Sequence, residues 1–266
     1  MVSCFKTDMT LGASIVIATY NGANYLDDQM RSILAQISSH DEVIVMDDHS
    51  SDDTRAIVAH YGREHANIKL LANERNIGVR ATFERLLSVA TKDTLILSDQ
   101  DDIWIDGRRD RMIEALRHQG CVAVLANARI LTEDGAERTF FPEARSPNVD
   151  SIAQNYFRNN FIGCCMAIRR EVLELALPFP ATISMHDWWL GSCAIALGRV
   201  RYLAEPSLFY RRHTNNQSAG KRRSWRIVIK DRMGNLRALV VLWRRVLHRR
   251  LTGRRLRNAL SVGGDV

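Results

Sequence analysis

The segment Ser98-Asp99-Gln100-Asp101-Asp102 places three carboxylates within four positions, directly after an apolar run. Like charges that pack together repel and are costly to desolvate, so such a cluster favours a compensating cation. Carboxylate oxygens suit Mg²⁺ or Mn²⁺. An isolated acidic triplet is more often a solvated turn that caps the next helix. The strands and helices around the cluster are therefore needed to distinguish a turn from a metal site.

A short buried strand over residues 94–97 positions this cluster, because the strand ends just before Asp99. Ligands of open α/β sheets lie at the carboxyl ends of the strands. Strands are also predicted at 14–19, 42–46 and 68–71, and helices at 24–38, 52–65 and 79–90. This alternation predicts a mostly parallel sheet with helices on both faces, so the polar strand ends gather along one edge.

The pattern continues less regularly after the cluster. An irregular loop is expected over residues 131–151, where Pro142 and Pro147 occur. The remaining predicted elements are helices at 107–119, after Arg170 and at 185–197, strands at 122–125, 161–168 and 201–204, and a polar segment at 210–217.

Composition is typical of a globular protein, with 266 residues, 46% hydrophobic and 25% charged. No apolar run approaches the roughly 18 residues of a membrane span, and the first residues lack the apolar core of a signal peptide. We therefore expect a cytoplasmic protein. The five cysteines are an odd number without metal-ligand spacing, and they indicate reduced, buried thiols. A redox role for Cys164-Cys165 is rejected because the flanking residues are apolar.

Charge is distributed unevenly. Residues 221–266 carry fourteen lysines and arginines against two aspartates, a net charge of +12, which leaves −5 for residues 1–220. Apolar residues recur near helical spacing from Trp225 to Leu251, which predicts a basic amphipathic helix. Such a helix suits the surface of an anionic membrane, and packing on the first domain is the alternative. We thus expect a catalytic domain over 1–220 and a tail over 221–266.

Three strand ends together resemble the inverting family 2 glycosyltransferases with a GT-A fold. They are Ala18-Thr19-Tyr20-Asn21-Gly22, residues 47–54 and the acidic cluster. The resemblance continues through His186-Asp187-Trp188-Trp189 and Tyr210-Arg211-Arg212-His213, so it spans residues 13–220. The segment from Ser98 to Trp104 is similar to bacterial rhamnosyltransferases of surface-polysaccharide assembly.

The resemblance implies a nucleotide-sugar donor, such as dTDP-rhamnose or a UDP-hexose, and a divalent Mg²⁺ or Mn²⁺ ion. It assigns the metal to Asp101, with Asp99 and His213 as further candidates, and the diphosphate to Arg211 or Arg212. A carboxylate at Asp48 would read an imide N–H of the base, although Asp48 can also be a turn former. The implied nucleotide-binding residues are Thr19, Tyr20, Asn21, Asp48, Asn76, Gly78, Arg80 and Asp99.

On the acceptor side, inversion at an anomeric carbon needs one general base, and the resemblance gives this role to Asp187. Relatives commonly carry a Glu-Asp pair at this position, whereas this chain has His186-Asp187. Asp187 can also cap the helix that follows. The acceptor is expected to be a hydroxyl of a glycan or a lipid-linked sugar in O-antigen, capsule or exopolysaccharide synthesis. Candidate acceptor contacts are Asp102, Trp104, Trp188 and Trp189.

Two other classes explain less of the sequence. A nucleic-acid-binding protein would account for the tail at pI ≈ 9.4 but not for the acidic strand ends, which would repel phosphate. A dinucleotide dehydrogenase would need a Gly-rich G-x-G-x-x-G turn after the first strand, and Thr19 to Asn24 does not supply it.

Overall fold

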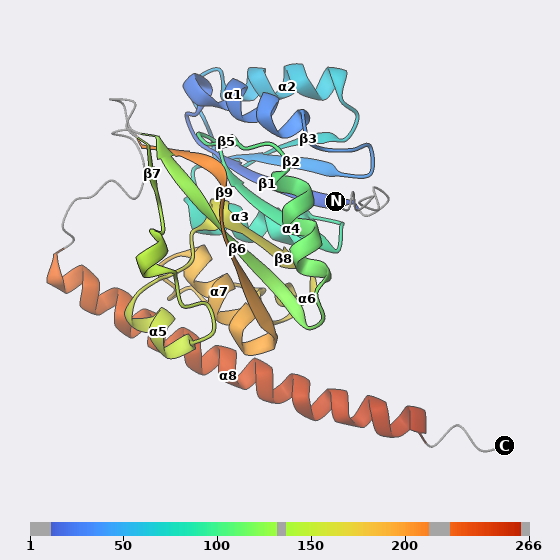
Figure 1. The fold of residues 1–266 in the computed structure, drawn as a ribbon, viewed down its shortest axis with the longest axis vertical. Helices are drawn as coiled ribbons and strands as arrows, with labels where there is room; N and C mark the ends of the chain where they lie inside the picture. Colours follow the sequence, from blue (N-terminus) through green and yellow to red (C-terminus); the bar gives the residue numbers. More distant parts are fainter. Residues whose placement is uncertain (1–11, 132–136, 213–223, 262–266) are drawn as a thin grey trace.

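A mixed sheet flanked by helices organises the computed structural model, which describes residues 12–131, 137–212 and 224–261 (Figure 1). Side chains of the last helix are described as far as residue 252. Within these residues the strand order is β3-β2-β1-β4-β8-β6-β9-β5, and β7 pairs with β6. The predicted α/β class with helices on both faces of a sheet is confirmed.

The first half of the sheet is parallel, as predicted. Its strands are β1 (Ala13–Thr19), β2 (Glu42–Asp47), β3 (Ile68–Ala72) and β4 (Thr94–Asp99), and its connecting helices are α1 (Ala23–Leu34), α2 (Thr54–Glu64) and α3 (Val79–Val89). Ile15 and Ile17 of β1 pack toward α1 and α2, whereas Val16 packs toward α3. This alternation follows from the two-residue period of a strand.

The second half of the sheet is mixed. It contains β5 (Ile103–Trp104), β6 (Cys121–Leu131), β7 (Glu137–Thr139), β8 (Met166–Arg169) and β9 (Arg199–Arg211). Strand β8 is antiparallel to both β4 and β6, while β9 runs parallel to β6. The helices are α4 (Arg108–Arg117), α5 (Ile152–Phe157), α6 (Glu171–Ala176) and α7 (His186–Leu197), with short 3₁₀ turns η1 (Glu143–Arg145) and η2 (Gly163–Cys165).

Two predicted strands differ from the elements that the structure contains. The strand expected over 161–168 is a 3₁₀ turn followed by a strand of four residues, although its apolar residues are buried as expected. The strand expected over 201–204 continues to Arg211, because its second half pairs with β5, whose partner position is distant in sequence. Tyr210 and Arg211 therefore belong to a strand and not to a polar loop.

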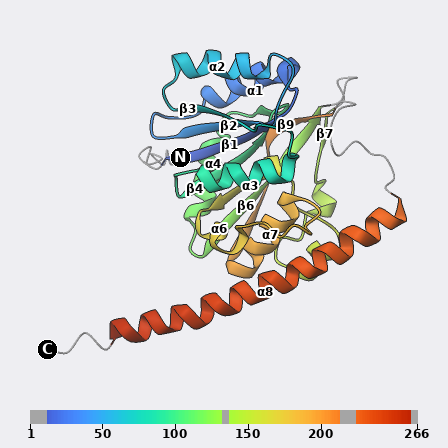
Figure 2. The same cartoon turned by 180° about the vertical axis from the view of Figure 1, so that it is seen from behind.

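The tail forms α8 (Trp225–Ser261), which runs along α5, α6 and α7 and extends past them (Figures 1 and 2). Ala238 and Leu242 are buried against the body, and the Arg245 guanidinium donates to the carbonyl oxygen of Leu175 at 2.7 Å. This face of the helix thus packs against α5, α6 and α7. No helix in the described part of the chain combines the length and apolar character needed to cross a bilayer.

The cysteines within the described residues, Cys121, Cys164, Cys165 and Cys193, are free and buried. The expectation of buried, reduced thiols is confirmed for these four, and Cys4 lies outside the described residues. Burial and a hydrogen bond with Cys165 raise the pKa of the Cys164 thiol well above its usual range, so this thiol stays protonated.

Candidate active site

A cavity of about 1000 Å³ opens at the carboxyl ends of β1, β2 and β4. The topology therefore brings together strand ends that are far apart in the sequence. The predicted site residues that line this cavity are Thr19, Tyr20, Asn21, Asp48, Asn76, Gly78, Asp99, Asp101, Asp187 and Arg212.

The acidic cluster presents two carboxylates to this cavity. Asp99 ends β4, and the side chain of Asp101, which is 8% exposed, follows two positions later. Burial and the charges of Asp101 and Asp187 raise the pKa of Asp99 to about 7. A divalent cation would relieve this repulsion, and carboxylate oxygens are its preferred ligands. Asp99 and Asp101 therefore fit the predicted metal site.

Asp102 has a different environment. Its side chain is fully buried, does not line the cavity, and has no hydrogen-bond partner for either oxygen among the described residues. Asp99, Asp102 and Cys164 have ligand atoms within 4.8 Å of one another, but the protonated thiol is a poor ligand for a hard cation. Burial raises the pKa of Asp102 well above its usual range. Because Asp102 is buried and does not line the cavity, the structure does not support its predicted contact with the acceptor.

The side chain of Gln100, which is not among the predicted site residues, holds the loop after β1. Gln100 accepts the backbone N–H of Tyr20 at 2.8 Å and donates to the Tyr20 carbonyl at 3.2 Å. A Cβ atom at Gly22 would lie 2.3 Å from the Gln100 amide oxygen, so a larger residue there would displace this amide. Asn21 accepts the backbone N–H of Ser51 at 2.9 Å. Tyr20 remains 47% exposed at the cavity, where its ring is available to a base.

Asp48 organises the loop that follows β3. Its carboxylate accepts the backbone N–H groups of Ile77 at 2.9 Å and Gly78 at 2.8 Å, and the Asn73 amide at 2.8 Å. Gly78 has a φ of 83°, which favours glycine. The turn-forming alternative is thus realised, while Asp48 still lines the cavity. Arg80 does not line it and donates instead to the carbonyls of Ala181 and Ile183, so its assignment to the nucleotide is wrong.

Asp187 lies in the first turn of α7 and faces the same cavity. One carboxylate oxygen accepts the backbone N–H of Trp188 at 2.6 Å and the side-chain amide of Asn159 at 3.2 Å. Burial raises the pKa of Asp187 to about 6, and these hydrogen bonds oppose the rise. Such a group is a proton acceptor near neutral pH. Asp187 is not the N-cap residue of α7, which is Met185, although its side chain accepts a backbone N–H of the first turn.

His186 precedes Asp187 in the first turn of α7. The imidazole is 4% exposed and stacks on Phe83 with ring centroids 4.0 Å apart. Burial lowers the pKa of His186 to about 3, so the ring is neutral. A side chain at Gly163 would meet the Nε2 atom of His186. The ring therefore fills the wall beside Asp187 without adding charge.

The tryptophans belong to the core. Trp104, Trp188 and Trp189 are at most 3% exposed, and their indole N–H groups donate to Ser98, Asn155 and Ala176, respectively. The prediction that these rings stack on acceptor sugars is wrong, because large apolar rings gain more free energy in the core.

Arg211, the last residue of β9, and Arg212, which follows it, have different surroundings. Arg211 forms an ion pair with Asp28 at 3.0 Å and lies over the Tyr25 ring, and it does not line the cavity. Its assignment to the diphosphate is therefore not supported. Arg212 is exposed and lines the cavity, so it is the better placed of the pair. His213 lies outside the described residues.

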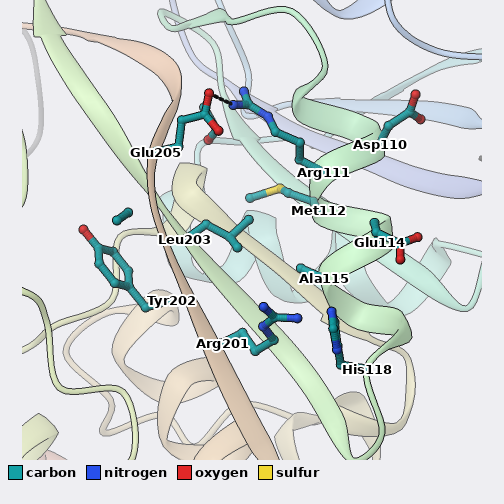
Figure 3. A pocket seen from close by; sticks show the side chains of 12 residues that line it. Asp110, Arg111, Met112, Glu114, Ala115, His118, Arg201, Tyr202, Leu203 and Glu205 are labelled. Atoms are coloured by element: carbon teal, nitrogen blue, oxygen red, sulfur yellow. Dashed lines mark ion pairs between the residues drawn. The ribbon is translucent and has the colours of Figure 1, made fainter. Parts of the chain in front are cut away.

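A second cavity of about 460 Å³ lies between α4 and β9 (Figure 3). Met112 and Leu203 supply apolar surface, and Arg111 forms an ion pair with Glu205 at 2.8 Å across its rim. This cavity contains none of the acidic cluster and none of the predicted site residues. We therefore place the chemistry in the larger cavity.

The order of strands and helices, with carboxylates at the end of β4, is that of the GT-A fold class. Residues 14–176 match the model of glycosyl transferase family 2, which is more than half of the chain. The chain belongs to this family.

Curated relatives agree with the family. An uncharacterised protein of Mycobacterium tuberculosis is 30% identical over 76% of this chain, which spans 59% of that protein. The dTDP-rhamnosyl transferase RfbG of Shigella flexneri is 28% identical over 76% of this chain and 73% of its own length. The UDP-Glc:alpha-D-GlcNAc-diphosphoundecaprenol beta-1,3-glucosyltransferase WfgD of Escherichia coli is 26% identical over 66% of this chain and 67% of its own.

Solved structures show the same fold at lower identity. Residues 1–349 of S. aureus TarS, in complex with UDP-GlcNAc, superpose with a TM-score of 0.65 at 19% identity, over 80% of this chain and 62% of that fragment. The mannosyltransferase PcManGT of Pyrobaculum calidifontis, in complex with GDP-Man and Mn²⁺, gives a TM-score of 0.57 at 18% identity, over 89% and 64% of the two chains.

Proposed function

We propose that this protein is a metal-dependent, inverting glycosyltransferase that moves a sugar from a nucleoside-diphosphate sugar to an acceptor hydroxyl. The observation that carries the proposal is that one cavity holds both Asp187 and the Asp99–Asp101 pair. The charge of Asp187 contributes to the raised pKa of Asp99, so these carboxylates interact. A proton acceptor and a cation-binding pair are the two components that this reaction needs.

In the proposed mechanism Asp187 takes the proton of the acceptor hydroxyl. The acceptor oxygen then forms a bond to the anomeric carbon, and the bond from this carbon to the diphosphate oxygen breaks with its electron pair. Asp99 and Asp101 would hold Mg²⁺ or Mn²⁺, which supplies charge stabilisation to the diphosphate when bound. Arg212 would pair with the same anion.

The donor is proposed to be dTDP-rhamnose or a UDP-hexose. Tyr20 offers an exposed ring to the base, while Asp48 holds the loop with Asn76 and Gly78 beside it. The printed names of RfbG and WfgD, a dTDP-rhamnosyl transferase and a UDP-glucose-dependent enzyme, support these two nucleotides. The product would be a bacterial surface polysaccharide such as O-antigen, capsule or exopolysaccharide.

The tail is proposed to seat the enzyme on the anionic cytoplasmic face of the cell membrane, near a lipid-linked or glycan acceptor. The face of α8 opposite the body exposes large apolar side chains, including Leu236, Trp243 and Leu251, at 55%, 65% and 56%. Exposed arginines flank them. An apolar row beside cations suits an anionic bilayer. A nucleic-acid-binding protein is less well supported, because the apolar row would remain unexplained.

The decisive experiment incubates the full chain and Mn²⁺ with a panel of nucleotide sugars and glycan or lipid-linked acceptors. Proton NMR of the product gives the anomeric configuration. We expect transfer from a dTDP- or UDP-sugar, loss of transfer with EDTA, and an anomeric configuration opposite to that of the donor. A product that retains the donor configuration would disprove the single-displacement mechanism.

A further inference from the structure

The segment Phe157-Arg158-Asn159 connects the tail helix to the candidate base. Phe157 ends α5, and Arg232 of α8 donates hydrogen bonds to the carbonyl oxygens of Tyr156 and Phe157. The Arg232 guanidinium also lies 5.9 Å from the centroid of the Phe157 ring. The end of α5 is therefore fixed against α8 rather than left as an independent loop.

The three side chains of this segment differ in chemistry along the chain. Phe157 is 71% exposed, which is unusual for a large aromatic side chain. Arg158 is exposed and lines the active-site cavity, and in the part of the chain that the structure describes it has no carboxylate partner. Asn159 donates to Asp187 at 3.2 Å. The segment thus presents an aromatic ring, a cation and an amide bound to the base.

The exposed face of α8 also carries large apolar side chains. Its large side chains follow one another at spacings of four and three residues, so they lie on one face of the helix. A basic row with spacings of four and seven residues runs beside them. The apolar row is Ile229, Met233, Leu236, Val240, Trp243 and Leu247, and the basic row is Arg226, Lys230, Arg237 and Arg244.

A second copy of the chain is a poor occupant for this face, because two basic rows would repel. An anionic lipid surface complements the charge and covers the apolar side chains. A sugar carried on a lipid through a diphosphate presents an apolar chain, then an anion, then a hydroxyl. This order matches the order of Phe157, Arg158 and Asn159.

We propose that Phe157, Arg158 and Asn159 select an acceptor sugar that is carried on a lipid diphosphate. Phe157 and the apolar row of α8 contact the lipid, and Arg158 binds the acceptor diphosphate. Asn159 is a positioning residue that orients Asp187 toward the sugar hydroxyl. This inference rests on the proposed glycosyl transfer and adds the chemical class of the acceptor.

The test measures binding of decyl diphosphate, below its micellar concentration, to the full chain by isothermal titration calorimetry in EDTA. EDTA removes divalent cations, so the probe cannot bind as the donor diphosphate would. We expect Arg158→Ala to weaken binding about tenfold or more, since it removes a charge-assisted contact, and Arg158→Lys to weaken it less. Arg145→Ala, an exposed arginine of η1 outside the cavity, is the matched control.

Two further probes separate the lipid from the anion. Inorganic pyrophosphate should bind much more weakly than decyl diphosphate, and Phe157→Ser should weaken only the decyl probe. Decyl glucoside, which has the chain without the anion, should not distinguish Arg158→Ala from wild type. Equal binding of decyl diphosphate to Arg158→Ala and wild type would overturn the proposal, and so would equal affinity for pyrophosphate and decyl diphosphate.

A separate binding measurement distinguishes failure of the acceptor proposal from failure of the proposed glycosyl transfer. Binding of UDP with Mn²⁺ tests the proposed donor residues after β1, β2 and β4. If wild type bound no nucleotide with Mn²⁺, the glycosyl-transfer proposal would fail irrespective of Arg158. If nucleotide binding were normal in Arg158→Ala while decyl diphosphate binding fell, the variant would be folded and the acceptor proposal would stand.

Discussion

The side chain of Gln100 forms two hydrogen bonds with the backbone of Tyr20, accepting its N–H at 2.8 Å and donating to its carbonyl at 3.2 Å. Gln100 stands between Asp99 and Asp101, while Tyr20 follows the end of β1. One amide therefore joins the carboxylates proposed for the cation to the ring proposed for the base. The base and the diphosphate of a bound nucleotide sugar would be positioned by the same contact.

Removing this amide should weaken donor binding. We expect Gln100→Ala to raise the KM for the nucleotide sugar about tenfold, because two hydrogen bonds are lost, with a smaller change in kcat. Steady-state kinetics at saturating acceptor measure both. Gln119→Ala, on the exposed turn after α4, should leave the KM unchanged. A Gln100→Ala enzyme with wild-type KM would show that the contact does not shape the donor site.

The acidic pair should control the metal requirement. We expect Asp101→Asn to abolish most of the Mn²⁺-dependent binding of UDP and to lower turnover by two orders of magnitude or more, roughly the contribution of an electrostatic clamp. Thermal unfolding with UDP, with and without Mn²⁺, measures the coupling. The control is Asp106→Asn, an exposed aspartate of the same region. Undiminished Mn²⁺ coupling in Asp101→Asn would exclude Asp101 as a ligand.

Asp187 should act on the chemical step alone. Asp187→Asn removes the proton acceptor but keeps the shape of the side chain, so we expect kcat to fall roughly 10²–10⁴-fold. Donor affinity, measured by titration with UDP and Mn²⁺, should stay within about twofold of wild type. Asp150→Asn, an exposed aspartate outside the cavity, should behave as wild type. Normal turnover of Asp187→Asn would remove the assignment of the base.

The pH dependence follows from the same carboxyl. Burial raises the pKa of Asp187 to about 6, and only the ionised form can accept a proton. Activity should therefore be lost as pH falls through this value, with kcat/KM decreasing about tenfold per pH unit below it. A bound cation would lower the pKa, so the midpoint should lie at or below about 6. The observation that would refute this is an acid limb centred well above pH 7.

The tail should bind anionic membranes through its exposed face. We expect Val240→Asp to weaken binding to phosphatidylglycerol vesicles about tenfold or more, because it places an anion in the apolar row. Val89→Asp, at the end of α3, is a matched control, since Val89 is 43% exposed and Val240 is 47% exposed. Turnover on a short soluble acceptor should persist in both variants. Equal vesicle binding by the two variants would contradict membrane contact through this face.

Much of the first half of the fold could be predicted from the sequence. Short β-branched runs that stop at polar residues gave the positions of β1, β2 and β4, because strand periodicity and turn chemistry are local properties. The predicted places of Asp48 and Asp101 at strand ends are confirmed by the fold, and their chemical roles stay predictions. The second half of the fold was predicted less completely, because β8 and β9 are defined by pairing with strands that are distant in the sequence.

The residue types at the strand ends, and hence the gathering of carboxylates at one edge of a parallel sheet, follow from local patterns along the chain. Which of these carboxylates face the cavity depends on tertiary packing. Asp101 lines it while the adjacent Asp102 is buried, and the tryptophans enter the core. The contact of Gln100 with Tyr20 spans eighty positions. Such choices depend on long-range packing and on the direction of each side chain, neither of which local residue patterns contain.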